Sequence, residues 1–264
     1  MRRRTQLAIL LLLLDSTASS VQAHYNMLLP NKSSVKKGET VTFTYQWGHP
    51  FEHQLFDAPA PESLVVVAPD GTKRDLLKSL SKIDVPSGEG KKVTGFQFRF
   101  TVEQRGDYVF LLNTPPIWME EEQEFYQDVV KVVLHVQAQK GWDAVAGGGF
   151  ELLPLTRPYG LTPGMVFQAQ CRAGGKPLES ALVEIERYNA MPPKALPPDE
   201  QITRTAKTDP NGVVTATLTD PGWWCLAAQR DGGQRERDGK KYRVRQRSTF
   251  WVHVDDSAGR EAGK

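Results

Sequence analysis

Short segments in which apolar and polar residues alternate, separated by turn-forming residues, are the feature that most restricts how this chain can fold. In residues 40–47 four apolar side chains alternate with Thr and Gln, which puts them on one face of an extended strand. Residues 92–102 carry three phenylalanines in the same arrangement. Further strand-length apolar segments occupy residues 64–68, 106–112 and 128–136. Strands at this spacing predict an antiparallel β-sandwich.

The pattern stops at the glycine-rich residues 144–149 and then resumes, which predicts two domains. Later strands are expected at 165–171, 182–188, 202–208, 213–218, 223–229 and 248–254. The fold class is therefore predicted to be all-β, with two β-sandwich domains of immunoglobulin-like or transthyretin-like type in tandem. Their expected bounds are 24–140 and 151–256, joined by a linker at 141–150 and followed by a tail at 257–264. One short helical turn is expected within residues 115–127.

The first 23 residues have the order of a secretory signal peptide. Three arginines precede the apolar run of eight residues at 7–14, and Val21 and Ala23 supply small side chains before the expected cleavage site. The run is too short to cross a bilayer, and the alternative is a short buried helix. We expect cleavage between Ala23 and His24, a periplasmic or secreted location, and no transmembrane segment in the mature chain.

Charge and cysteine content narrow the function classes. Removing residues 1–23 takes away three arginines and one aspartate and leaves equal numbers of basic and acidic residues. A neutral chain has no overall field to attract nucleic acid, so no nucleic-acid partner is expected. The two cysteines, Cys171 and Cys225, predict a disulfide bond in an exported chain, with two buried thiols as the alternative.

His24 is the most informative of the five histidines. Cleavage after Ala23 would make it the first residue, so that its α-amine and its imidazole together form a bidentate chelate. The amine has an ordinary pKa near ~7.7–8 and the imidazole near ~6.5, so both lose their protons readily at neutral pH. Such nitrogen ligands suit Cu(II), Ni(II) and Co(II). Cleavage at a nearby bond would instead leave His24 an ordinary surface residue.

A second candidate cluster follows the first full strand. His49 and His53 lie four residues apart on either side of Pro50, which prevents a regular helix, so both are expected on a loop. Glu52 and Asp57 lie nearby. The sequence predicts one metal site made of His24, His49, His53, Glu52 and Asp57. The alternative is that the two loop histidines only donate hydrogen bonds to backbone.

Other residues carry weaker signals. His135 shares a strand face with Lys131, so it is expected to point toward solvent. His253 shares a strand face with Trp251, so it is expected to pack in a strand. The sequence lacks the lipase-type G-x-S-x-G motif, phosphate-binding and dinucleotide-binding glycine motifs, and H-E-x-x-H. No catalytic residues are predicted, and the chain is not expected to be an enzyme.

The sequence resembles the periplasmic components of cobalt/nickel transport systems, a family also described as a domain of unknown function. The most specific segments carrying the resemblance are Gly141-Trp142-Asp143 and 153–161; the others are Ala23-His24, Pro30, 38–41, Gly48-His49, 106–108, 128–136, 175–178, 183–186, 208–212 and 221–224. The resemblance implies a periplasmic accessory to nickel or cobalt uptake without catalytic activity, and it carries the family's mature N-terminal histidine onto His24. The second half also looks like the transthyretin-type or carboxypeptidase-regulatory sandwich, which concerns structure only.

Three functions are therefore weighed. The first is a non-catalytic metal-binding accessory whose cargo is nickel or cobalt, with copper chemically possible and a membrane nickel/cobalt transporter as partner. The second is a secreted interaction module that binds a surface protein or glycan, in which Trp118, Phe125 and Tyr126 would matter more than the histidines. The third is a copper redox protein in which the His24 chelate and one more imidazole form a histidine brace.

Overall fold

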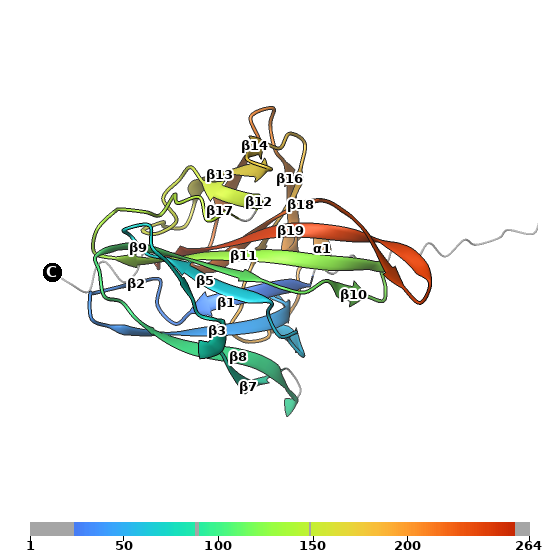
Figure 1. Ribbon diagram of the computed structural model, residues 1–264, viewed down its shortest axis with the longest axis horizontal. Helices are drawn as coiled ribbons and strands as arrows, with labels where there is room; N and C mark the ends of the chain where they lie inside the picture. Colours follow the sequence, from blue (N-terminus) through green and yellow to red (C-terminus); the bar gives the residue numbers. More distant parts are fainter. Residues whose placement is uncertain (1–23, 88–89, 148, 257–264) are drawn as a thin grey trace, which may run out of the picture.

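The computed structural model describes residues 24–87, 90–147 and 149–256, and the predicted signal peptide (1–23) and tail (257–264) lie outside the described residues. The described chain is almost entirely β-structure, so the predicted fold class is confirmed (Figure 1). Its helical elements are one 3-10 turn, η1 (Leu77–Ser79), and one short helix, α1 (Asp199–Ile202). The prediction of a short helical turn within 115–127 is wrong, because residues 117–119 pair with residues 124–126 as antiparallel strands.

The described strands form three sheets. A five-stranded sheet has the order β1 (Tyr25–Pro30), β3 (Thr40–His49), β8 (Lys92–Thr101) and β7 (Ser81–Pro86), with β4 (Gln54–Phe56) paired to β3. A four-stranded sheet has the order β12 (Phe150–Pro154), β13 (Met165–Ala173) and β14 (Lys176–Pro177), with β17 (Val213–Leu218) paired to β13. Every pairing within these two sheets is antiparallel.

The third sheet has ten strands and contains residues from both halves of the chain. The second half supplies β16 (Arg204–Lys207), β15 (Leu182–Arg187), β18 (Gly222–Arg237) and β19 (Lys240–Val254). The first half continues the order with β11 (Glu124–Val136), β9 (Gly106–Asn113), β5 (Ser63–Val67) and β6 (Lys73–Asp75), while β10 (Ile117–Met119) and β2 (Ser34–Val35) also pair with β11. The halves meet where β11 runs parallel to β19, in a register that sets Asp128 beside Arg247.

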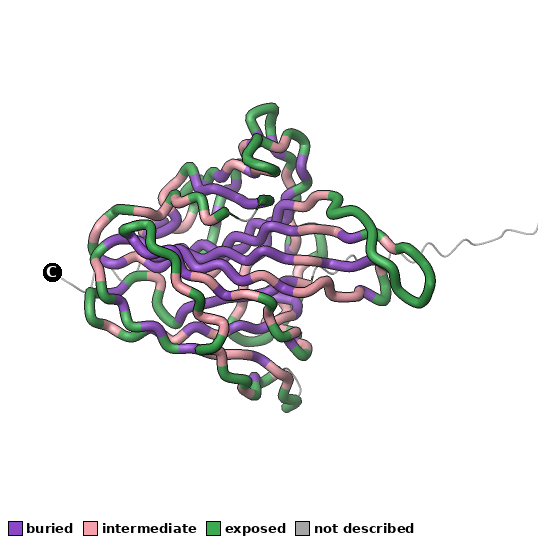
Figure 2. Tube along the Cα trace, in the orientation of Figure 1, coloured by how far each residue is buried: buried purple, intermediate pink, exposed green. Residues whose placement is uncertain are grey.

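The ten-stranded sheet is the middle layer of the molecule and buries both of its faces. One face packs on the five-stranded sheet and the other on the four-stranded sheet, which gives two separate hydrophobic cores. Trp251 of β19 belongs to the first core and its neighbour Phe250 to the second, as alternation along a strand requires. In Figure 2 the central strands are accordingly buried, whereas the far end of the β18–β19 hairpin is exposed.

The continuity of this sheet bears on the predicted division into two domains. Each half does contribute one sandwich layer, but the strands that complete the two sandwiches belong to the shared sheet. The separation into independent domains at residues 141–150 therefore stays a prediction.

Candidate functional site

The structure brings His24 and His49 together. Strand β1 pairs antiparallel with β3 so that Tyr25 lies opposite Gly48, and His24 therefore stands at the end of the sheet where β3 finishes at His49. The two imidazole rings have centroids 4.3 Å apart and planes inclined by 47°. Metal–nitrogen bonds are about 2.0–2.1 Å long, so two nitrogens on one ion lie within about 4 Å of each other. With their centroids 4.3 Å apart, the two rings are close enough for one nitrogen of each to reach a common ion.

Aromatic side chains surround this pair of imidazoles. The His24 ring stacks on Trp47 at 5.3 Å and lies 5.2 Å from Phe56, which is also 5.6 Å from the His49 ring. The β3–β4 hairpin sets Phe56 opposite Trp47, and His49 is only 3% exposed. An apolar surround limits the access of water and fixes ring orientation, both of which affect a metal bound by imidazole.

Gly48 makes the close return of β4 possible. Its φ of +148° lies outside the range that side chains favour, and a Cβ there would stand 2.1 Å from the carbonyl oxygen of Gln54. Because any side chain would collide with this backbone, the Gly-His sequence at 48–49 has a direct structural cause. Gly48 thus lets the hairpin bring Phe56 against both imidazoles.

The other three predicted ligands make different contacts. The Nδ1 of His53 lies 2.9 Å from the carbonyl oxygen of Asn189, and burial lowers the pKa of His53 because it disfavours the imidazolium. Glu52 is half-buried, and its pKa is raised by burial and by the charge of Asp199. Asp57 is exposed and accepts a 2.7 Å hydrogen bond from the amide of Thr94, which lowers its pKa.

Over residues 24–87, 90–147 and 149–256, no group of three or more His, Cys, Asp and Glu side chains is arranged to hold an ion. The structural candidate is therefore the His24–His49 pair. The third nitrogen suggested by the sequence is the α-amine of residue 24, which is free only in a chain cleaved after Ala23. That His53, Glu52 and Asp57 also bind the ion remains a prediction.

The predicted disulfide is corrected by the structure, in which Cys171 and Cys225 are both buried free thiols. Cys171 on β13 faces the core beneath the four-stranded sheet, whereas Cys225 on β18 faces the core beneath the five-stranded sheet. The ten-stranded sheet lies between them, so the bond cannot form. Burial raises the pKa of Cys171 to about 12 and that of Cys225 well above its usual range, which makes both thiols unreactive.

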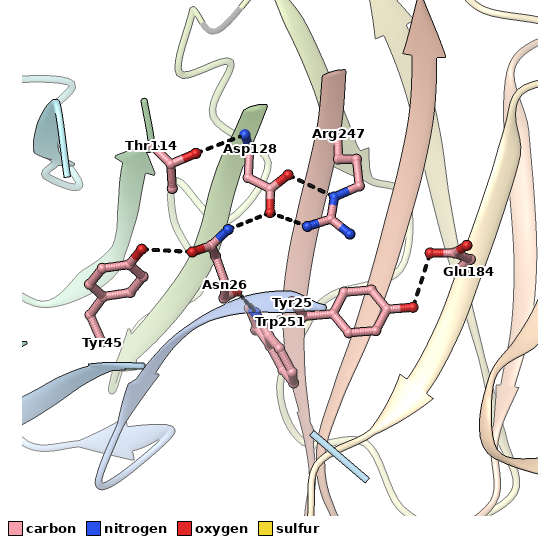
Figure 3. Close-up of polar contacts among 8 residues, drawn as sticks. All are labelled: Tyr25, Asn26, Tyr45, Thr114, Asp128, Glu184, Arg247 and Trp251. Atoms are coloured by element: carbon pink, nitrogen blue, oxygen red, sulfur yellow. Dashed lines mark hydrogen bonds and ion pairs between the residues drawn. The ribbon is translucent and has the colours of Figure 1, made fainter. Parts of the chain in front are cut away.

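Beneath the candidate site lies a buried polar network that the sequence analysis missed (Figure 3). Asp128 accepts hydrogen bonds from Nε and Nη2 of Arg247 at 2.7 and 2.6 Å, and both side chains are at most 1% exposed. Asn26 donates to Asp128 at 2.6 Å and accepts from the hydroxyl of Tyr45, also at 2.6 Å. Charged residues that interrupt otherwise apolar strand sequences were the available signal, because such residues are rarely buried unless paired.

This network fixes β1, the strand that begins directly after His24. The hydroxyl of Tyr25 donates to Glu184 at 3.1 Å, and the indole of Trp251 donates to the carbonyl oxygen of Asn26 at 3.0 Å. All six residues of β1 are buried. The two residues directly after His24 are thus tied to strands from both halves of the chain, which leaves the backbone at His24 little freedom.

The remaining histidines have local partners. The Nδ1 of His135 lies 2.7 Å from Asp107, and its ring stacks on Tyr159 with centroids 3.9 Å apart, so His135 is mostly covered rather than directed to solvent. His253 packs against Trp223 and lies 3.3 Å from Asp255. Neither approaches the His24–His49 pair in any described contact.

Solved structures resemble this chain only weakly. A DUF4785 family protein from Legionella pneumophila has a TM-score of 0.29 and 13% identity, with 78% of this chain and 52% of that chain covered. Elastase-activated α-2-macroglobulin from Escherichia coli has a TM-score of 0.24 and 15% identity, over 88% of this chain and 20% of the other. A two-domain fibronectin type III segment of chicken tenascin has a TM-score of 0.22 and 10% identity, over 87% and 100%. This chain therefore spans about half of the Legionella protein and a fifth of the macroglobulin.

No curated protein matches the sequence. Within the described residues, none of the helices has the length and apolar character needed to cross a bilayer. The sequence profile of DUF4198, a domain of unknown function, matches residues 21–232, which is most of the chain and includes both candidate histidines. The chain belongs to the DUF4198 family.

Proposed function

We propose that this protein is a non-catalytic, exported protein that binds one first-row transition-metal ion through His24 and His49. The observation that carries the proposal is the 4.3 Å separation of the two imidazole rings at the start of β1 and the end of β3. Two imidazoles and, after cleavage, the α-amine of His24 make a set of three nitrogen ligands. Nitrogen ligands favour Co(II), Ni(II) and Cu(II) over the harder cations.

The resemblance to nickel and cobalt uptake components supports nickel or cobalt as the cargo. The protein would hold nickel or cobalt in the periplasm and pass it to a membrane nickel/cobalt transporter. Of the other predicted ligands, Glu52 and Asp57 would serve as additional or supporting groups, and His53 would support the site without binding the ion. Affinity order alone favours copper, so selectivity for nickel or cobalt would depend on metal supply and on the partner.

A second candidate function is a copper redox protein of the histidine-brace type. The specific observation that favours it is the same three-nitrogen set, an amine and imidazole from one residue and a second imidazole at 4.3 Å. Copper-dependent peroxide production in the presence of a reductant would support it. Absence of that activity in a chain that binds copper would leave the accessory role.

The test uses protein exported with its native signal peptide, with the N-terminus established by mass spectrometry. Calorimetric titration with Ni(II), Co(II) and Cu(II) is expected to show one ion per chain. We expect His24→Ala and His49→Ala each to raise Kd by at least about tenfold, equivalent to about 1.4 kcal/mol. His253→Ala, which removes an imidazole that contacts Trp223 and Asp255, is the matched control and should leave Kd unchanged.

A chain with one extra residue before His24 tests the amine separately. Its imidazole remains, but the bidentate chelate is lost, so weaker binding is expected. Equal binding by the extended chain would remove the amine from the ligand set. If no metal binds or raises the melting temperature of the wild-type chain, the interaction-module alternative is favoured, because a ligand that binds only the folded state must stabilise it.

A further inference from the structure

The turn that follows His49 is held by one residue of the second half, Asn189. The amide of Asn189 donates to the carbonyl oxygen of Pro50 at 2.9 Å, and its side-chain Nδ2 donates to that of Phe51 at 2.6 Å. Its own carbonyl oxygen lies 2.9 Å from Nδ1 of His53. Three hydrogen bonds thus connect one residue to three positions of a four-residue turn. We call this set the 189 clamp.

The contact with His53 has a specific chemical consequence. A carbonyl oxygen only accepts hydrogen bonds, so Nδ1 of His53 carries the proton and donates it. His53 also has a φ of +54°, in the left-handed region that is energetically costly for a non-glycine residue. The hydrogen bond to Asn189 helps to offset that cost. His53 therefore has a structural role in the turn that its position in the sequence does not reveal.

Asn189 is itself well anchored. It lies two residues after the end of β15 at Arg187, and the amide of the intervening Tyr188 donates to the carbonyl oxygen of Trp223 at 2.8 Å. The same region reaches the turn a second time, because the amide of Phe51 donates to Glu186 of β15 at 3.2 Å. The second half thus presents a fixed surface on which the 50–53 turn rests.

The clamp holds the residues that directly follow His49. On one side, His49 is the last residue of β3 and pairs with Gln54 of β4. On the other, it is followed by Pro50, whose ring restricts φ and whose carbonyl is bonded to Asn189. With its backbone fixed on both sides, the His49 imidazole has few ways to leave the position 4.3 Å from His24.

We infer that Asn189 and His53 are positioning residues, which hold the 50–53 turn so that His49 faces His24, and that His53, which forms no group of three ligating side chains with that pair among the described residues, is not itself a ligand. The inference rests on the proposed metal-binding function and adds to it a contribution from the second half of the chain. A ligand held in place before binding loses less conformational freedom when the metal arrives, so the clamp raises affinity without touching the ion.

The test compares four variants of the processed chain, loaded with Cu(II) as the probe. Asn189→Ala removes the bond to Phe51, and His53→Ala removes the bond to Asn189; each is expected to raise Kd by about three- to tenfold. The nitrogen pattern in the electron paramagnetic resonance spectrum should still report the two imidazoles of the wild type. His53→Asn should recover most of the affinity, because asparagine tolerates the left-handed region and its amide can donate to the same carbonyl. Asn113→Ala, which removes an Nδ2 donor to Ser63 in the β5–β9 pair, is the matched control.

The outcomes separate this inference from the proposed function. Loss of one imidazole signal in both His53 variants would show that His53 is a ligand. That result would overturn the inference about the clamp but would leave the proposed metal binding intact. A lower melting temperature with unchanged Kd in both alanine variants would reduce the clamp to a purely structural role and also overturn it. If the wild type binds no metal, the proposed function fails. Amide exchange of His49 and of residues 51–53 still tests the clamp, with faster exchange expected in Asn189→Ala and unchanged exchange contradicting it.

Discussion

Replacing Asp128 with asparagine tests the buried network that anchors β1. The carboxylate of Asp128 accepts two hydrogen bonds from Arg247 and one from Asn26, all between 2.6 and 2.7 Å, in a region where neither charged side chain exceeds 1% exposure. Nη1 of Arg247 has no hydrogen-bond partner among the described residues, and the other described contacts of the guanidinium include the rings of Tyr126 and Tyr25, whose centroids lie 4.5 and 5.5 Å away. The substitution leaves a buried cation without its counter-ion.

Breaking a buried ion pair from one side costs about 3–5 kcal/mol, because the remaining charge stays desolvated. Domains are stable by only about 5–15 kcal/mol, so we expect Asp128→Asn to lower the free energy of unfolding by about a fifth of the total or more. Arg247→Met should have a comparable effect by leaving Asp128 unpaired. The double variant Asp128→Leu/Arg247→Met should be less destabilised than the sum of the single changes, since no buried charge remains.

Urea denaturation followed by tryptophan fluorescence measures these free energies, provided that the transition is two-state. A loss below about 1 kcal/mol for Asp128→Asn, within the range of an exposed pair, would refute the reasoning. So would strict additivity in the double variant. Because Asn26 lies next but one to His24, the same variant should also weaken metal binding, which the titration described above would detect.

Three further predictions concern stability and thiol reactivity. Burial raises the pKa of Glu186 to about 8, so the contribution of Glu186 to stability is complete below its ordinary pKa of 4.5 and is lost as the pH rises toward about 8. The stability of the wild type relative to Glu186→Gln should therefore fall across that interval by about 1.4 kcal/mol per pH unit. A difference in stability that stays constant with pH would contradict this prediction. Gly48→Ala should lower the melting temperature and the metal affinity together, because its methyl group would collide with the carbonyl of Gln54; a variant that matches wild type in both measurements would oppose this. Cys171 and Cys225 should resist alkylation in the native protein and react only on unfolding, with no change in melting temperature on adding a reductant; rapid native labelling counted by mass spectrometry would be the contrary result.

Alternation predicted the strands whose two faces differ in environment, and apolar runs predicted the buried strands β9 and β11. Residues 40–47 and 92–102 alternate because one face packs in the first core, and the observed β3 and β8 begin at the predicted residues. Strand β1 was missed, because all six of its residues are buried and no alternation remains to be read. The parallel pairing of β11 with β19 was also out of reach, since it joins segments about 120 positions apart without any local signal.

The candidate site shows the same limit. The sequence singled out both His24 and His49 as ligands, but the strand pairing that brings them together involves β1, which was not predicted. The partner of His53 lies 136 positions away, and nothing near His53 indicates that its ring donates to Asn189. The predicted disulfide was wrong for a related reason. The spacing of the two cysteines in the sequence does not determine on which face of the central sheet each side chain lies.

The measurement that tests the central claim most directly is metal titration of a processed chain that begins at His24, compared with its His49→Ala variant. The account predicts that the wild type binds one Ni(II), Co(II) or Cu(II) ion per chain, and that the Cu(II)-loaded form gives a spectrum reporting two imidazoles, one of which disappears together with most of the affinity in the variant. Equal affinity and an unchanged spectrum in His49→Ala, or no binding by the wild type, would contradict it.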